Sequence, residues 1–269
     1  MTSTALHSAA LFAYLIAAIL YGANLALRTA KHAALGRVGL IAGIALHTVG
    51  IGAFCVHTHQ SPFASNFGTL SVGAWIVAIL YLPVEFLARA PALGVLAAPV
   101  ASIMLFTGIL RSHGSLASAP EIRSRIVSVH VLLVLTSFAL FALAACCAVF
   151  YLWQYSILKH PDRRALFRRL PPLETVDSAA YHLVAFALPL LTMGLALGFA
   201  RAAGDSTRPN WMADPHTIVS IFSWVVYCGY LAARLVAGWR GTRLNYLLLA
   251  GLAVSLALFF IPSSTHRFS

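Results

Sequence analysis

Apolar residues run for about twenty positions at a time along this chain, and polar residues gather between the runs. About 20 consecutive apolar residues form a helix long enough to cross the hydrocarbon core of a membrane. Eight such runs predict spanning helices, at about 7–27, 38–57, 69–88, 92–110, 126–153, 181–200, 216–237 and 244–262. The longest polar stretch, Gln154 to Asp177, is interpreted as a loop. The pattern predicts an all-α, polytopic membrane helical bundle with one domain over residues 1–269.

Composition agrees with this pattern, since 60% of the 269 residues are apolar and only 9% are charged. Soluble domains have about a quarter of their residues charged.

The first span has no Lys/Arg cluster before it and no small-residue cleavage site after it, so we expect a retained helix rather than a signal peptide. No internal repeat of the kind that builds transporters is visible. Glycines at helical spacing, Gly36, Gly39 and Gly43, and Gly194 with Gly198, predict close helix contacts.

Basic residues concentrate in the loops that follow the odd-numbered spans, which hold 12 of the 18 lysines and arginines. These are Arg28, Lys31, Arg37, Arg89, Lys159, Arg163, Arg164, Arg168, Arg169, Arg234, Arg240 and Arg243. Basic loops stay in the cytoplasm, so both termini are predicted on the outer side. The net charge of +11 is then explained by topology and lipid headgroups, and nucleic acid is not an expected partner.

Histidines are numerous for a membrane protein, and the predicted topology places most of the 11 near the outer side. Those at or beyond the outer ends of spans are His57, His59, His113, His130, His216 and His266, with His7 near the first span. Paired imidazoles can hold haem iron or zinc, and position alone suits both equally. A single histidine at a helix end is more often an interfacial residue.

The four cysteines form neither CxxC nor CxxCH, so a haem would be held by side-chain ligands without covalent attachment.

Two segments in the first half carry a family resemblance. Leu46-His47-Thr48, then His59 to Ser71 and Trp75, are similar to the pattern LHT…PxxNxxESLS…W, with Gly68 in place of the glutamate. Val127 to Val131 resembles an xHV segment centred on His130.

Two more segments lie in the second half. Trp211 to His216 resembles a W-x-W-D-P-K-E loop, with Ala213 in place of the second tryptophan and His216-Thr217 in place of Lys-Glu. Ser264 to Phe268 resembles a G-L-H-S-Y ending that contains His266. Together the four segments resemble the cytochrome c assembly family, in its CcsA, ResC and HemX-like branch, which includes short YpjD-like members.

The resemblance implies that His130 and His266 are the two external ligands of a haem b iron, bound without covalent attachment. Trp211 would stack on the porphyrin, and Asp214 would cap the helix that follows or hold a ligand histidine. His47 and His59 are further cofactor-binding candidates, although a structural role is favoured for His47. No catalytic residue is indicated.

The family function implied is the presentation of haem at the outer face of the bacterial inner membrane for attachment to apocytochrome c. A membrane partner with a periplasmic domain, similar to CcsB or ResB, is expected, and membership of a haem-attachment complex is left open. The alternative is a HemX- or YpjD-like accessory or regulatory protein without haem transfer, because Ala232 stands where haem-exporting relatives have an intramembrane histidine. A proton-coupled transporter is disfavoured, since the spans contain almost no carboxylates.

Overall fold

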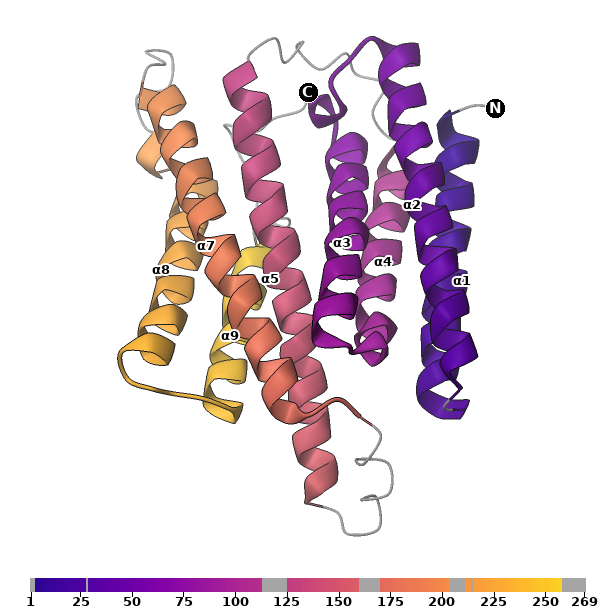
Figure 1. Ribbon diagram of the computed structural model, residues 1–269. Helices are drawn as coiled ribbons and strands as arrows, with labels where there is room; N and C mark the ends of the chain where they lie inside the picture. Colours follow the sequence, from indigo (N-terminus) through magenta and orange to yellow (C-terminus); the bar gives the residue numbers. More distant parts are fainter. Residues whose placement is uncertain are drawn as a thin grey trace. The chain divides into compact units, whose positions relative to one another are not determined.

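The computed structural model describes residues 3–27, 29–112, 125–159, 170–203, 211–213 and 215–257, in two compact units that divide between residues 123 and 124. Unit 1 contains the helices α1 (Ser3–Leu27), α2 (Ala30–Thr58), α3 (Asn66–Ala88) and α4 (Gly94–Ser112), with 3-10 turns η1 (Pro62–Ala64) and η2 (Pro91–Leu93). Unit 2 contains α5 (Arg125–Leu158), α7 (Leu173–Ala203), α8 (Pro215–Leu235) and α9 (Thr242–Ala257), with the 3-10 turn η4 (Trp211–Ala213). Figure 1 shows these helices coloured along the sequence.

The prediction of an all-α membrane bundle is confirmed. Across the described residues, 7 helices are long and apolar enough to cross a membrane, and a shorter apolar helix covers Thr242–Leu256. Each of the eight predicted spans coincides with one of these helices. Residues 258–262 of the eighth predicted span lie outside the described residues.

The loop predicted between Gln154 and Asp177 is shorter than expected, because α5 continues to Leu158 and α7 begins at Leu173. Gln154 is fully buried, and its side-chain amide donates to the carbonyl of Pro171 over 3.0 Å. Asp177 pairs with Arg234 of α8. Both side chains have a partner within the bundle, although Gln154 Oε1 has none among the described residues, so polarity alone overestimated the length of this loop.

Close packing of α1 on α2 depends on a ladder of glycines. His7, Tyr14 and Tyr21 follow one another at intervals of seven residues, and they lie against Gly50, Gly43 and Gly36. A Cβ atom on Gly43 would lie only 2.6 Å from the ring of Tyr14. Small residues therefore let the two backbones approach until the rings contact the opposite helix.

Both units use the same order of helix packing. In unit 1 the first helix, α1, contacts α2 and α4, and α3 contacts α4 and α2. In unit 2 the first helix, α5, contacts α7 and α9, and α8 contacts α9 and α7. A 3-10 turn precedes the third helix in each case. The two units thus share a topology, although the sequence showed no obvious repeat.

Candidate functional site

His130 lies one turn into α5, against α7. Its Nδ1 is 2.7 Å from the carbonyl oxygen of Gly194, so Nδ1 carries the proton and donates it. Its ring covers Gly198, where a Cβ atom would lie 2.7 Å from Cε1. Two glycines of α7 therefore supply both the acceptor and the space that fix the imidazole.

The Nδ1–H form of His130 leaves Nε2 with a free lone pair when the ring is neutral. None of the described residues forms a hydrogen bond with this Nε2. Histidines that bind a metal usually donate their other ring N–H to a carbonyl or carboxylate, which fixes the tautomer and the ring direction. The half-buried His130 has this arrangement already.

The tryptophan-containing loop begins unit 2's third helix. Trp211 is the first residue of η4, and Pro215 is the first residue of α8, where the missing N–H of proline has no cost. Asp214 and His266 lie outside the described residues, as does the side chain of Trp211. The pairing of His130 with His266 therefore stays a prediction.

His47 is fully buried and joins three helices of unit 1. Its Nδ1 lies 3.2 Å from the hydroxyl of Tyr14 on α1, and its Nε2 lies 2.8 Å from the hydroxyl of Ser71 on α3. Both ring nitrogens thus have partners, and iron coordination by His47 would break one of these bonds. The neighbouring Thr48 accepts a hydrogen bond from Trp75 Nε1 over 2.8 Å, so the matched LHT, SLS and W positions meet in space.

His59 and Gly68 shape the link between α2 and α3. His59 is exposed and ends α2 in the left-handed region, at a φ of 54°. Gly68 faces η1, and a Cβ atom there would lie 1.9 Å from the carbonyl oxygen of Pro62. A glutamate at position 68, as in the family pattern, would therefore require η1 to move.

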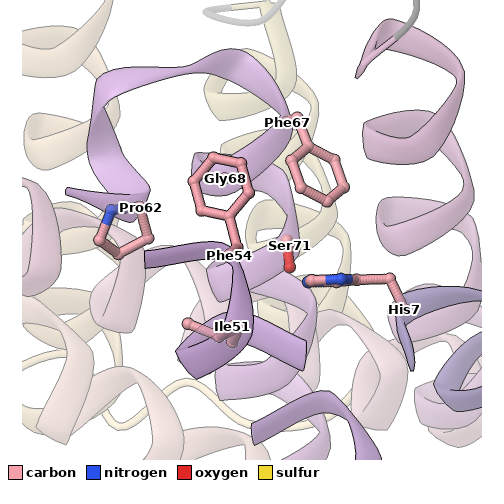
Figure 2. A pocket seen from close by; sticks show the side chains of 7 residues that line it. All are labelled: His7, Ile51, Phe54, Pro62, Phe67, Gly68 and Ser71. Atoms are coloured by element: carbon pink, nitrogen blue, oxygen red, sulfur yellow. The ribbon is translucent and has the colours of Figure 1, made fainter. Parts of the chain in front are cut away.

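His7 is a residue whose importance the sequence analysis missed. It is 1% exposed, and its Nδ1 lies 2.8 Å from the carbonyl oxygen of Ser3. It borders a small pocket with Phe54, Phe67 and Ser71, shown in Figure 2. The interval of seven residues to Tyr14 and Tyr21 was the available signal, because it places all three on one face of α1.

Metal sites built from several protein ligands are not present in the described part of the chain, where no group of three or more His, Cys, Asp or Glu side chains converges. The rings of His7 and His47 are in edge contact, with centroids 5.3 Å apart, while His130 lies in the other unit.

Comparison with known proteins supplies a family. A family model described as "Cytochrome C assembly protein" matches residues 65–267, which extend over both units. The cytochrome c biogenesis protein CcsA of Picosynechococcus sp. is 23% identical over 279 residues, which cover 82% of each chain. The protein of the same name from Guillardia theta is 23% identical over 244 residues, covering 82% of this chain and 81% of its own length.

A solved structure also resembles the chain. It is described as the cytochrome c heme lyase CcmF, with a TM-score of 0.69 at 15% sequence identity. The match covers 98% of this chain and 48% of that protein, so this chain corresponds to about half of the larger structure. The likeness supports the helical fold.

Proposed function

The chain belongs to the cytochrome c assembly protein family and acts in cytochrome c maturation; we propose that it holds haem b for attachment to apocytochrome c. The haem would lie at the outer face of the bacterial inner membrane. Side-chain ligands alone would hold it, because the sequence has no CxxCH motif.

The observation that carries this proposal is the state of His130. Its Nδ1–H donates to the carbonyl of Gly194, its ring packs against Gly198, and its Nε2 has a lone pair. This is the hydrogen-bonding arrangement of an axial iron ligand. His266, at the position of the family's second external histidine, would be the opposite axial ligand.

The protein's contribution to thioether formation is the positioning of the reactants. Bound haem would supply vinyl groups, to which the cysteine thiols of apocytochrome c add. Trp211 at the start of η4 would stack on the porphyrin, and Asp214 would cap α8. Holding the two reactants in one orientation replaces a bimolecular encounter with an effectively unimolecular step. A membrane partner with an external domain, similar to CcsB or ResB, would deliver the apocytochrome.

One observation favours a second function, that of a HemX- or YpjD-like accessory protein without haem transfer. Ala232, at the position of the intramembrane histidine of haem-exporting relatives, is exposed on α8 and offers only a methyl group. An accessory protein would keep the bundle and its partner contacts without needing His130 as a ligand.

Visible spectroscopy separates the two functions. The protein is expressed with ample haem, purified in mild detergent and compared with His130→Ala and His266→Ala. His182→Ala is the matched control. Nδ1 of His182 bonds to a backbone carbonyl, as that of His130 does, but the carbonyl is that of Ser178 (2.8 Å) on the same helix, and the side chain of His182 is exposed. We expect a bis-histidine b-type spectrum that is lost in the first two variants and kept in the control. A folded wild type that binds no haem, or a spectrum unchanged in His130→Ala, would refute the haem-presenting function.

A further inference from the structure

A repeat relates the third helix of unit 1 to that of unit 2. Residues 62–85 and 211–234 align without a gap, and each segment begins with a three-residue 3-10 turn that is followed by a long helix. Both helices carry the pattern S-x3-W-x5-Y-L-x2-charged, with Trp75 corresponding to Trp224. The two tryptophans therefore provide a common reference point for comparing the units.

The second helices can be aligned through these tryptophans. Each indole donates to a threonine of the second helix, Thr48 in unit 1 over 2.8 Å and Thr192 in unit 2 over 2.9 Å. A glycine comes two residues after each threonine, Gly50 in one unit and Gly194 in the other. Gly50 and Gly194 therefore occupy equivalent positions on α2 and α7.

The carbonyls of these two glycines both accept a hydrogen bond from the first helix of their unit. In unit 1 the donor is the hydroxyl of Ser3, at 3.3 Å from the carbonyl oxygen of Gly50. In unit 2 the donor is Nδ1 of His130, at 2.7 Å from the carbonyl oxygen of Gly194. His130 thus has the place that a serine has in unit 1, and an imidazole needs more space than a hydroxymethyl group.

Gly198 provides this space. It follows Gly194 by four residues, so the two glycines lie one above the other on one face of α7. A Cβ atom on Gly198 would lie 2.7 Å from Cε1 and 3.0 Å from Nδ1 of His130, closer than ordinary contacts allow. The equivalent position on α2 is Phe54, whose side chain at position 198 would fill the volume that the imidazole occupies.

We propose that Gly198 is the positioning residue for His130, and that it determines why unit 2 rather than unit 1 presents an imidazole at this carbonyl for axial ligation of haem iron. This inference rests on the proposed function, because it takes His130 as the iron ligand. Gly198 keeps the Nδ1 proton on the α7 carbonyl and so leaves Nε2 for the iron.

The bond to Gly194 also affects the strength of the ligand. A carbonyl that accepts the Nδ1 proton raises the basicity of the other ring nitrogen and fixes the direction of the ring. If a side chain at position 198 displaces the ring, the imidazole loses this acceptor and must turn to another, such as a carbonyl of its own helix, which is the acceptor that His7 uses at Ser3. Nε2 then points in another direction, and iron ligation weakens.

Gly198→Ala tests this role, with Gly229→Ala as the matched control. A Cβ atom on Gly229, in α8 of the same unit, meets nothing within 4 Å, so the control makes the same exchange within a long helix but displaces no neighbour. The purified proteins are titrated with ferric protoporphyrin IX in mild detergent. Gly198→Ala should bind haem about tenfold more weakly than wild type and lose low-spin absorbance, whereas the control should match wild type in both.

A double-mutant cycle with His130→Ala shows whether Gly198 acts through His130. In the His130→Ala background, Gly198→Ala should change the remaining haem affinity by less than about twofold, since no imidazole is left to displace. An equal loss of affinity in that background would show that Gly198 acts on the packing of α5 against α7, and it would overturn the inference. Wild-type haem affinity in Gly198→Ala would overturn it as well.

The haem-free protein gives an independent readout. In protein labelled with nitrogen isotope at histidine, the Nδ1–H signal of His130 is assigned by its absence from His130→Ala. We expect this signal to shift in Gly198→Ala, because the 2.7 Å bond to Gly194 is lost, and to stay unchanged in Gly229→Ala. An unchanged signal in Gly198→Ala refutes the inference and leaves the proposed function standing. A shifted signal in a protein whose wild type binds no haem refutes the proposed function, while the orientation of His130 by Gly198 is upheld.

Discussion

Units 1 and 2 share one scaffold but treat its central histidine differently. In each unit, the first helix brings a histidine against a glycine of the second helix, and a tryptophan of the third helix bonds to a threonine of the second. The side chain of His7 is buried, with 1% of its area exposed, whereas that of His130 is half-buried. The turn differs too, since η1 begins with Pro62 and η4 begins with Trp211. The bundle therefore places a histidine in the second turn of the first helix in each unit, and the residues around it determine how exposed it is.

The units also differ in which helix carries the acid of the ion pair between the second and third helices. In unit 1, Arg37 of the second helix donates to Glu85 of the third, with a nitrogen–oxygen distance of 2.7 Å. In unit 2, the second helix carries the acid, Asp177, and the third carries Arg234. Glu85 and Arg234 occupy equivalent positions in the repeat. In both units this position of the third helix forms an ion pair with the second helix, with the acid on the third helix in unit 1 and on the second helix in unit 2.

The largest expected effect comes from breaking the pair in unit 1. Glu85 is 1% exposed, so Arg37→Ala leaves a buried carboxylate without Arg37, although the hydroxyl of Tyr21 still donates to it over 2.6 Å. Loss of one member of a buried pair typically costs about 3 kcal/mol or more. We expect a decrease of about 3 kcal/mol in the free energy of unfolding, measured by SDS titration in mixed micelles.

Reversing the charges tests whether the order matters. The double variant Arg37→Glu with Glu85→Arg gives unit 1 the order found in unit 2. We expect it to recover about half of the loss, because the opposite charges attract again but Tyr21 no longer faces a carboxylate. A double variant less stable than both single variants would show that the two pairs are not equivalent.

A smaller effect is expected at the glycine ladder of unit 1. Gly43→Ala places a Cβ atom 2.6 Å from the ring of Tyr14, so α1 and α2 must separate. Overpacking of this kind costs about 1–3 kcal/mol. Gly39→Ala is the control, since its Cβ atom would have its first contact at 3.6 Å, an ordinary distance. Equal unfolding midpoints for the two variants would contradict the ladder.

Much of the fold could be predicted because apolar runs report directly on membrane spans. Helix ends could not be predicted as well, since Gln154 and Asp177 are polar but bonded within the bundle. The hydropathy of a residue does not show whether a neighbouring helix provides a hydrogen-bond or ion-pair partner for it. The similarity of the third helices of the two units was also not predicted from the sequence, because the charged position is Glu85 in one helix and Arg234 in the other.

For the candidate site, the family resemblance selected His130 among the outer histidines, and the structure adds its acceptor and its tautomer. It also selected His47, whose two partners, Tyr14 and Ser71, lie on other helices and could not be read from local pattern. His7 was missed because its burial arises from tertiary packing against Gly50. Spacing identifies which residues share a face of a helix, whereas burial depends on which helix covers that face.

The smallest expected effect concerns the tryptophans, and it tests the equivalence of the two units most directly. Trp75→Phe and Trp224→Phe each remove one indole hydrogen bond to a threonine hydroxyl while keeping an aromatic ring. A single neutral hydrogen bond contributes about 1 kcal/mol. Since the bonds are 2.8 and 2.9 Å long in matching surroundings, the two losses should agree within about 0.5 kcal/mol. The threonines keep their own bonds to Ile44 and Leu188, so no buried donor is left without a partner. Losses that differ by more than a factor of two would show that the two units share a pattern of residues but not its energetics.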